Sequence, residues 1–79
     1  MPTLLRWRGF RFFFYSNEAH EPPHIHVENG EGHIKIWLEA LEVARVQGIP
    51  SHDVSDVLSK VEECREEFLK AWYDYFSGR

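Results

Sequence analysis

Three histidines stand close together in the segment HIHVENGEGH, and two of them are separated by a single residue. Alternate side chains of a β-strand point to the same face, so His24 and His26 would lie about 6.5–7 Å apart on one face of an extended segment. If the chain then turns back as a hairpin, His33 joins that face from the neighbouring strand. Imidazole nitrogens are common ligands of transition metals. The spacing therefore predicts a site for Zn²⁺, Fe²⁺ or Mn²⁺ (zinc, iron or manganese) formed by His24, His26 and His33.

Nearby carboxylates can complete such a site. Glu28, or a carboxylate of the preceding loop, Glu18 or Glu21, can supply a fourth ligand or act as a base on a bound water. The same pattern has two other interpretations, which the sequence leaves open. The histidines can form a polar surface for a protein or nucleic acid, or they can hydrogen-bond the preceding loop in a purely structural role.

A metal-free enzyme is a further alternative. His24 or His26 can act as general acid and base on a phosphodiester, while Arg11 and Lys35 stabilise the developing negative charge and Tyr15 orients the substrate. These residue types suit RNA cleavage. The candidate catalytic residues are His24, His26, Arg11, Tyr15 and Glu18.

A hairpin must position the three histidines. Asn29-Gly30 is a strong hairpin signal, because a type I′ turn needs positive φ at both central residues. A two-residue loop, and a four-residue loop from Asn29 to Gly32 that shifts the pairing by two, both separate the same two faces. One face would carry Ile25, Val27, Ile34, Ile36 and Leu38, and the other His24, His26, His33 and Lys35. A three-residue loop would instead set histidines opposite isoleucines, so the alternation excludes it.

The rest of the chain supplies partners for this hairpin. Leu4 to Arg8 and Phe10 to Tyr15 read as two short strands, followed by a loop with the sequence SNEAHEPP. Glu39 to Gln47 reads as a short helix that ends at Gly48. After Pro50, apolar residues recur at threes and fours, which predicts one helix of about 25 residues closed by Gly78.

The expected fold is α+β: a mainly antiparallel sheet of about four strands, with one short and one long C-terminal helix on one face. The chain has 79 residues, enough for a single domain over residues 1–79. Its twelve aromatic residues crowd the two ends of the sequence. A core in which the two ends meet is therefore expected.

The charge and the cysteine content limit the kinds of binding partner and the cellular compartment that we expect. The formal net charge is −4, which disfavours sequence-independent nucleic-acid binding, so RNA could bind only at the basic N-terminal strands that carry Arg6, Arg8 and Arg11. The single cysteine, Cys64, cannot form an internal disulfide, and no signal peptide or membrane span is recognisable. We expect a cytoplasmic protein, with no membrane association, that binds a protein partner or forms a homo-oligomer.

The run FRFFFYSNEAHEPPHIHVENGEGHIKIWL and the terminal motif AWYDYF resemble the small prokaryotic family catalogued as domain of unknown function 4160. The resemblance implies a compact α+β domain. It brings no assigned catalytic residues, and it does not say whether the histidines bind a metal. Genes of that family often neighbour those of another small family, numbered 2442, in an arrangement like toxin–antitoxin pairs. The resemblance therefore implies an interaction module of a toxin–antitoxin-like pair. The alternative, which comes from the face formed by His24, His26 and His33, is a ribonuclease or metal-assisted phosphodiesterase. The family positions to test are Tyr15, Ser16, Asn17, Glu18, Pro22, Pro23, His24 and His26.

Overall fold

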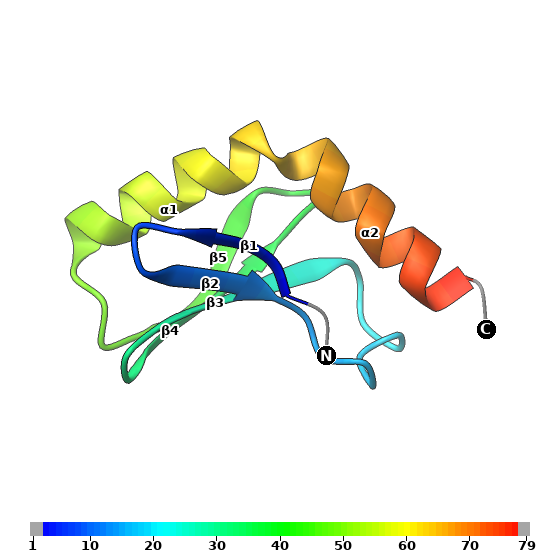
Figure 1. Ribbon diagram of the computed structural model, residues 1–79, viewed down its shortest axis with the longest axis horizontal. Coiled ribbons are helices and arrows are strands. Elements are labelled where there is room, and N and C mark those ends of the chain that lie inside the picture. The colour runs from blue at the N-terminus through cyan, green and yellow to red at the C-terminus, as the bar shows by residue number, and fades with distance from the viewer. Residues whose placement is uncertain (1–2, 78–79) are drawn as a thin grey trace.

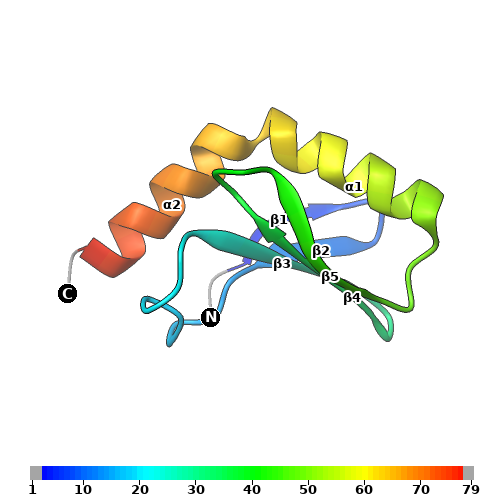
Figure 2. The same cartoon turned by 180° about the vertical axis from the view of Figure 1, so that it is seen from behind.

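The computed structural model describes residues 3–77, which form one five-stranded antiparallel sheet and two helices. The strands are β1 Thr3–Trp7, β2 Phe10–Phe13, β3 His24–Asn29, β4 Gly32–Trp37 and β5 Glu42–Gln47, and the helices are α1 Ser51–Glu63 and α2 Arg65–Ser77. The strands lie in sequence order, so the sheet is a simple meander. Both helices lie across the same face of the sheet (Figures 1 and 2). The α+β class is confirmed, and the sheet has five strands instead of about four.

The β3–β4 hairpin has the pairing that was predicted for the four-residue loop. Glu28 lies opposite His33 and Asn29 opposite Gly32, so Gly30 and Glu31 form the turn. Gly30 has φ +59° while Glu31 has no positive φ, a combination typical of a type II′ turn and not of the type I′ turn expected at Asn29-Gly30. The register places the five predicted apolar side chains on one face, where all of them are fully buried.

The segment from Glu39 to Gln47 is not a helix, and this prediction was wrong. A turn at residues 38–41 leads into β5, which pairs antiparallel with β4. Val43 and Val46 lie opposite Ile36 and Ile34, and β-branched residues fit a pleated sheet surface. The free edge of β4 needs hydrogen-bond partners, and this need outweighs the weak helical pattern. Gly48 does have a positive φ of 68°, but it follows a strand.

The single long helix is also corrected, because the chain bends at Cys64 between α1 and α2. Cys64 has φ −100° and ψ 10°, outside the helical range. Its N–H still donates to the carbonyl oxygen of Lys60, and the N–H of Phe68 donates to the carbonyl oxygen of Cys64. The hydrogen bonding thus continues through the bend, and the two helices form an arch over the sheet (Figure 1). The predicted end at Gly78 lies outside the described residues.

The core fills the space between the sheet and this arch. Its fully or almost fully buried side chains are Phe10, Phe12, Phe14, Ile25, Val27, Ile34, Ile36, Leu38, Val57, Val61, Phe68 and Trp72. Phe14, just after β2, packs its ring 5.1 Å from Trp72 and 5.4 Å from both Tyr75 and Phe76. The expected meeting of the N-terminal and C-terminal aromatic residues is confirmed.

Neither α1 nor α2, the two helices found in residues 3–77, is long and apolar enough to cross a membrane.

Candidate functional site

The sheet face opposite the helices, called here the outer face, carries the polar half of the hairpin. Cross-strand pairing sets one row of this face as Phe13, His26, Lys35 and Arg45. The next row is Arg11, Glu28, His33 and Gln47. His24 stands at the start of β3, opposite Trp37. The predicted common face of His24, His26 and His33 is therefore confirmed by the strand register.

The loop between β2 and β3 folds against the start of β3 and brings a carboxylate to these histidines. Glu18 accepts a hydrogen bond from the backbone N–H of Tyr15 (3.0 Å), and its carbonyl oxygen accepts one from the N–H of Glu21 (3.1 Å). At the end of the loop, the carbonyl oxygen of Pro23 accepts a hydrogen bond from the N–H of Leu38. Two successive prolines stiffen this exit, so the loop has a fixed position relative to β3.

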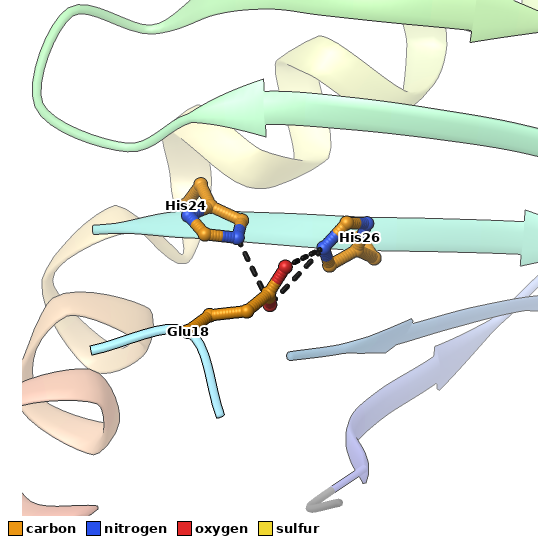
Figure 3. Close-up of side chains that lie close together, drawn as sticks. All are labelled: Glu18, His24 and His26. Carbon is orange, nitrogen blue, oxygen red and sulfur yellow. Dashed lines mark hydrogen bonds and ion pairs between the residues drawn. The ribbon is translucent and has the colours of Figure 1, made fainter. Parts of the chain in front are cut away.

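Glu18, His24 and His26 converge on one point (Figure 3). His24 Nε2 lies 3.0 Å from Glu18 Oε1, and His26 Nε2 lies 3.0 Å from Oε2 and 3.2 Å from Oε1 of the same carboxylate. One ligand atom from each of the three residues lies within 4.8 Å of the others. His24 is fully buried, His26 is 3% exposed, and the Glu18 side chain is 14% exposed. Three potential metal ligands thus meet in a site that is largely shielded from water.

The second ring nitrogen of each histidine also has a partner. His24 Nδ1 lies 2.9 Å from the carbonyl oxygen of Pro22, which can only accept, so Nδ1 carries the hydrogen. In the neutral ring, Nε2 then carries the lone pair. Although Nε2 is close to Glu18, their geometry does not meet the requirements of a hydrogen bond, and Nε2 is the one buried side-chain polar atom among residues 3–77 without such a bond.

His26 is held in a similar way by a side chain. Its Nδ1 lies 2.9 Å from His33 Nε2, and the two ring centroids are 5.0 Å apart. His26 also stacks on Phe13 at 5.6 Å and meets the ring of Tyr15 at 4.8 Å. The ring of His26 is thus held by two aromatic neighbours and by partners at both nitrogens.

The environment shifts the proton affinities of this cluster. Burial raises the pKa of Glu18, but the hydrogen bonds from His26 and the Tyr15 N–H, together with the nearby ring of His24, outweigh burial and hold the net pKa below 4.5. Burial lowers the pKa of His26 below 6.5, although the hydrogen bond to Glu18 opposes this change. Burial, together with the charge of Arg45, also lowers the pKa of His33. At neutral pH the cluster therefore favours an ionised carboxylate beside neutral imidazoles at His26 and His33, which are the ligand forms that bind metal ions.

The structure brings only some of the predicted site residues together. Tyr15 contacts His26, and Lys35 lies opposite His26 but donates to Glu21 Oε1 at 2.7 Å. His33 bonds to Nδ1 of His26, the ring nitrogen that points away from Glu18. Arg11 lies farther off, since it donates to Glu28 Oε1 (2.8 Å) and Thr3 Oγ1 (2.9 Å).

The basic N-terminal strands do not form one cationic surface. Arg11 is paired with Glu28, and Arg8 pairs with Asp56 of α1 at 3.3 Å while it lies over the ring of Trp7. Among the described residues, Arg6 is the member of the predicted trio without an ion pair. RNA binding at these strands stays a prediction.

Sequence reasoning did not find the residues that enclose His24. Its ring centroid lies 4.9 Å from that of Trp72 and 5.5 Å from that of Trp37. Trp72 is far away in sequence, so no local pattern pointed to it. The one available signal for the Pro22 contact was the position of Pro22-Pro23 directly before His24.

Two imidazoles and one carboxylate make a donor set known from metal sites in other proteins, both the His₂Glu sites of zinc enzymes and the facial triads of non-haem iron enzymes. Two ligand atoms bound at about 2.1 Å to one ion, at an angle of about 90–110°, are about 3.0–3.4 Å apart. The 3.0–3.2 Å separations between the carboxylate oxygens and the two Nε2 atoms match this value, which is also an ordinary hydrogen-bond length, and all three ligand atoms lie within 4.8 Å of one another. The residues present therefore fit a divalent metal ion.

These features define a two-layer α+β protein with a shielded Glu-His-His cluster at the start of β3, between the β2–β3 loop and Trp72 of α2. The chain belongs to the family described as domain of unknown function (DUF4160), which matches residues 9–73. This match includes Glu18, His24, His26 and His33. No curated protein and no solved structure is detectably similar to the chain.

Proposed function

We propose that this protein binds one divalent metal ion, Zn²⁺, Fe²⁺ or Mn²⁺, through Glu18, His24 and His26. The observation that carries the proposal is the buried Nε2 of His24, which has no hydrogen bond and faces the same carboxylate as Nε2 of His26. A buried nitrogen without a partner costs about 1–3 kcal/mol, which a metal–nitrogen bond would offset. His33 is not one of the three ligands in this proposal, in contrast to the set His24, His26 and His33 expected from the sequence.

The chemistry we propose for the site is hydrolysis of a phosphodiester. Three protein ligands would leave at least one coordination position for water, and a bound Zn²⁺ would lower the pKa of that water to about 7. Tyr15 lies beside His26 and can contact a substrate, and Lys35 can hold an anionic group if it exchanges its present partner Glu21 for the substrate. A ribonuclease or another metal-assisted phosphodiesterase is the class of enzyme that this combination favours.

The proposal is tested by metal analysis of protein purified without a polyhistidine tag. We expect about one equivalent of zinc, iron or manganese per chain, and Glu18→Gln should weaken rebinding of that metal more than about 100-fold, since a lost ligand costs more than a lost outer partner. Glu21→Gln is the matched control, because Glu21 belongs to the same loop but bonds Lys35. Protein that rebinds no metal after removal and dialysis against each of the three ions would refute the metal site.

The hydrolase is tested separately from the metal. His24→Ala with His26→Ala should abolish both metal-dependent RNA cleavage and any growth inhibition on expression, while circular dichroism shows a folded chain. Undiminished growth inhibition by the folded double variant would rule the hydrolase out.

A second candidate is the interaction module of a toxin–antitoxin-like pair. The observation that favours it is the outer face, which no helix covers (Figures 1 and 2). Tyr15 is 37% exposed beside the cluster, so a partner seated there would contact a direct neighbour of His26. The aromatic end of α2 is less available to a partner, because Trp72 is buried and Tyr75 and Phe76 pack on Phe14.

Co-expression with the product of the neighbouring gene tests this second candidate. A stable one-to-one complex, lost on Tyr15→Arg and kept on the matched change Tyr73→Arg, is expected. Recovery of only the free monomer at micromolar concentration would count against a partner.

A further inference from the structure

Each of the two proposed histidine ligands has an acceptor behind its ring. Behind His24 the acceptor is a backbone carbonyl, that of Pro22, which no side-chain substitution removes. Behind His26 it is a side chain, the ring of His33 on the neighbouring strand. A histidine that binds a metal through Nε2 keeps its hydrogen on Nδ1 and donates it to such a partner. His33 Nε2 is therefore the atom that must accept the hydrogen of His26 when the site is filled.

The position of His33 is set by the sheet and not by the loop that carries Glu18. His33 lies in β4 opposite Glu28, and its ring meets the edge of Phe13 at a centroid distance of 6.5 Å and an angle of 76°. Phe13 in turn stacks on His26. The rings of Phe13, His26 and His33 thus pack on one another, which fixes the direction of the Nδ1–Nε2 bond between the two histidines.

We infer that His33 is a positioning residue of the metal site: by accepting the Nδ1 hydrogen of His26, it orients the ring so that Nε2 points at the metal beside Glu18. This inference rests on the metal function proposed above. It assigns His33 an outer role in place of the direct ligand role expected from the sequence. Outer partners of this kind typically contribute about 10–100-fold to metal affinity.

Titration of the metal-free protein with Co²⁺, a spectroscopic substitute for Zn²⁺, tests the inference on four proteins: the wild type, His33→Leu, His33→Gln and His52→Leu. Leu cannot accept a hydrogen bond, so His33→Leu should bind Co²⁺ about 10–100-fold more weakly and with a shifted absorption band. Gln places an amide oxygen near the position of Nε2, so His33→Gln should restore the affinity and band of the wild type. The exposed His52 is the control, and its change should have no effect.

The outcomes separate this inference from the function on which it rests. If the wild type binds one Co²⁺ and His33→Leu binds it equally well, the positioning role is overturned while the metal site stands. If His33→Gln loses as much affinity as His33→Leu, the ring of His33 is itself needed as a ligand or a packing group, and the inference is equally wrong. If the folded wild type binds no Co²⁺, the metal site fails and the role of His33 fails with it.

Discussion

His24 donates a hydrogen bond from Nδ1 to the carbonyl oxygen of Pro22 over 2.9 Å, and this bond determines what the other nitrogen can do. With its hydrogen on Nδ1, the neutral ring presents a lone pair at Nε2, only 3.0 Å from an oxygen of Glu18. Two lone pairs this close repel each other unless a proton or a metal ion lies beside both. The rigid Pro22-Pro23 segment thus prepares His24 as a ligand.

Tryptophan fluorescence should report metal binding, because the ring of His24 lies 4.9 Å from Trp72 and 5.5 Å from Trp37. Co²⁺, which is paramagnetic, is expected to quench the emission of both tryptophans, whereas Zn²⁺ is not. The measurement is an emission titration of the metal-free protein with each ion.

The third tryptophan supplies the control for this quenching. Trp7 packs against Phe10 and Phe12 instead of the histidines. Trp7→Phe should therefore keep most of the Co²⁺ quenching, and the double change Trp37→Phe with Trp72→Phe should remove most of it. Quenching that follows Trp7 would place the bound ion elsewhere.

Metal-free protein should lose stability as the pH falls below about 6.5, the usual value for histidine. Burial lowers the pKa of His26 and of His33 in the folded state, so the unfolded chain binds more protons in this range. Stability is then complete above the unfolded pKa and declines on acidification. Glu18, whose folded pKa is below 4.5, adds a second loss at lower pH as its carboxylate is protonated.

Urea unfolding at pH 7.5 and pH 5.5 with a chelator present measures this dependence. His33→Gln should reduce the difference between the two midpoints, whereas His52→Gln, a change at an exposed histidine, should preserve it. An equal pH dependence in all three proteins would show that His33 does not contribute.

The hairpin and its two faces were predictable because alternation constrains the register. Shifting the pairing by one residue would have placed the histidines opposite the isoleucines, so the apolar face selected the correct set of registers. The sequence did not show which carboxylate joins the histidines. The sequence offered Glu18, Glu21 and Glu28 as equivalent carboxylates, and only the folded loop shows that Glu21 bonds Lys35 and Glu28 bonds Arg11.

The errors lie where tertiary contacts outweigh local pattern. Residues 39–47 have the acids-first arrangement of a helix, yet β4 has an open edge and Val43 and Val46 complete the sheet. The continuous apolar stripe after Pro50 correctly predicted helical structure in this part of the chain, but it gave no sign of the bend at Cys64 that divides it into two helices. That bend lets the helical layer follow the sheet and brings Trp72 to His24.

Phe14 should be among the most sensitive positions for stability, because its buried ring contacts three aromatic rings of α2. Phe14→Ala should cost about 3–5 kcal/mol of unfolding free energy. A small domain often has little more than this in total, so Phe14→Leu, with a smaller loss, keeps the position measurable. Urea denaturation gives the values, and Val46→Ala at the half-exposed edge of β5 should change stability by less than about 0.5 kcal/mol.

Arg65 should stabilise the protein by connecting the helical bend to the sheet. Its guanidinium donates to the carbonyl oxygens of Leu38 and Glu39, both at 2.8 Å, where the chain leaves β4. Arg65→Met keeps the apolar stem but leaves these carbonyls without their charged donor. We expect a loss of about 1–2 kcal/mol, at the low end for charged hydrogen bonds because one of the two is exposed to water. Lys70→Met is the matched control on the same helix, since its pair with Asp74 is exposed to solvent and should contribute little to stability. Equal unfolding free energies for the two variants would mean that the bend is held by the packing of Phe68 and Trp72 and not by Arg65.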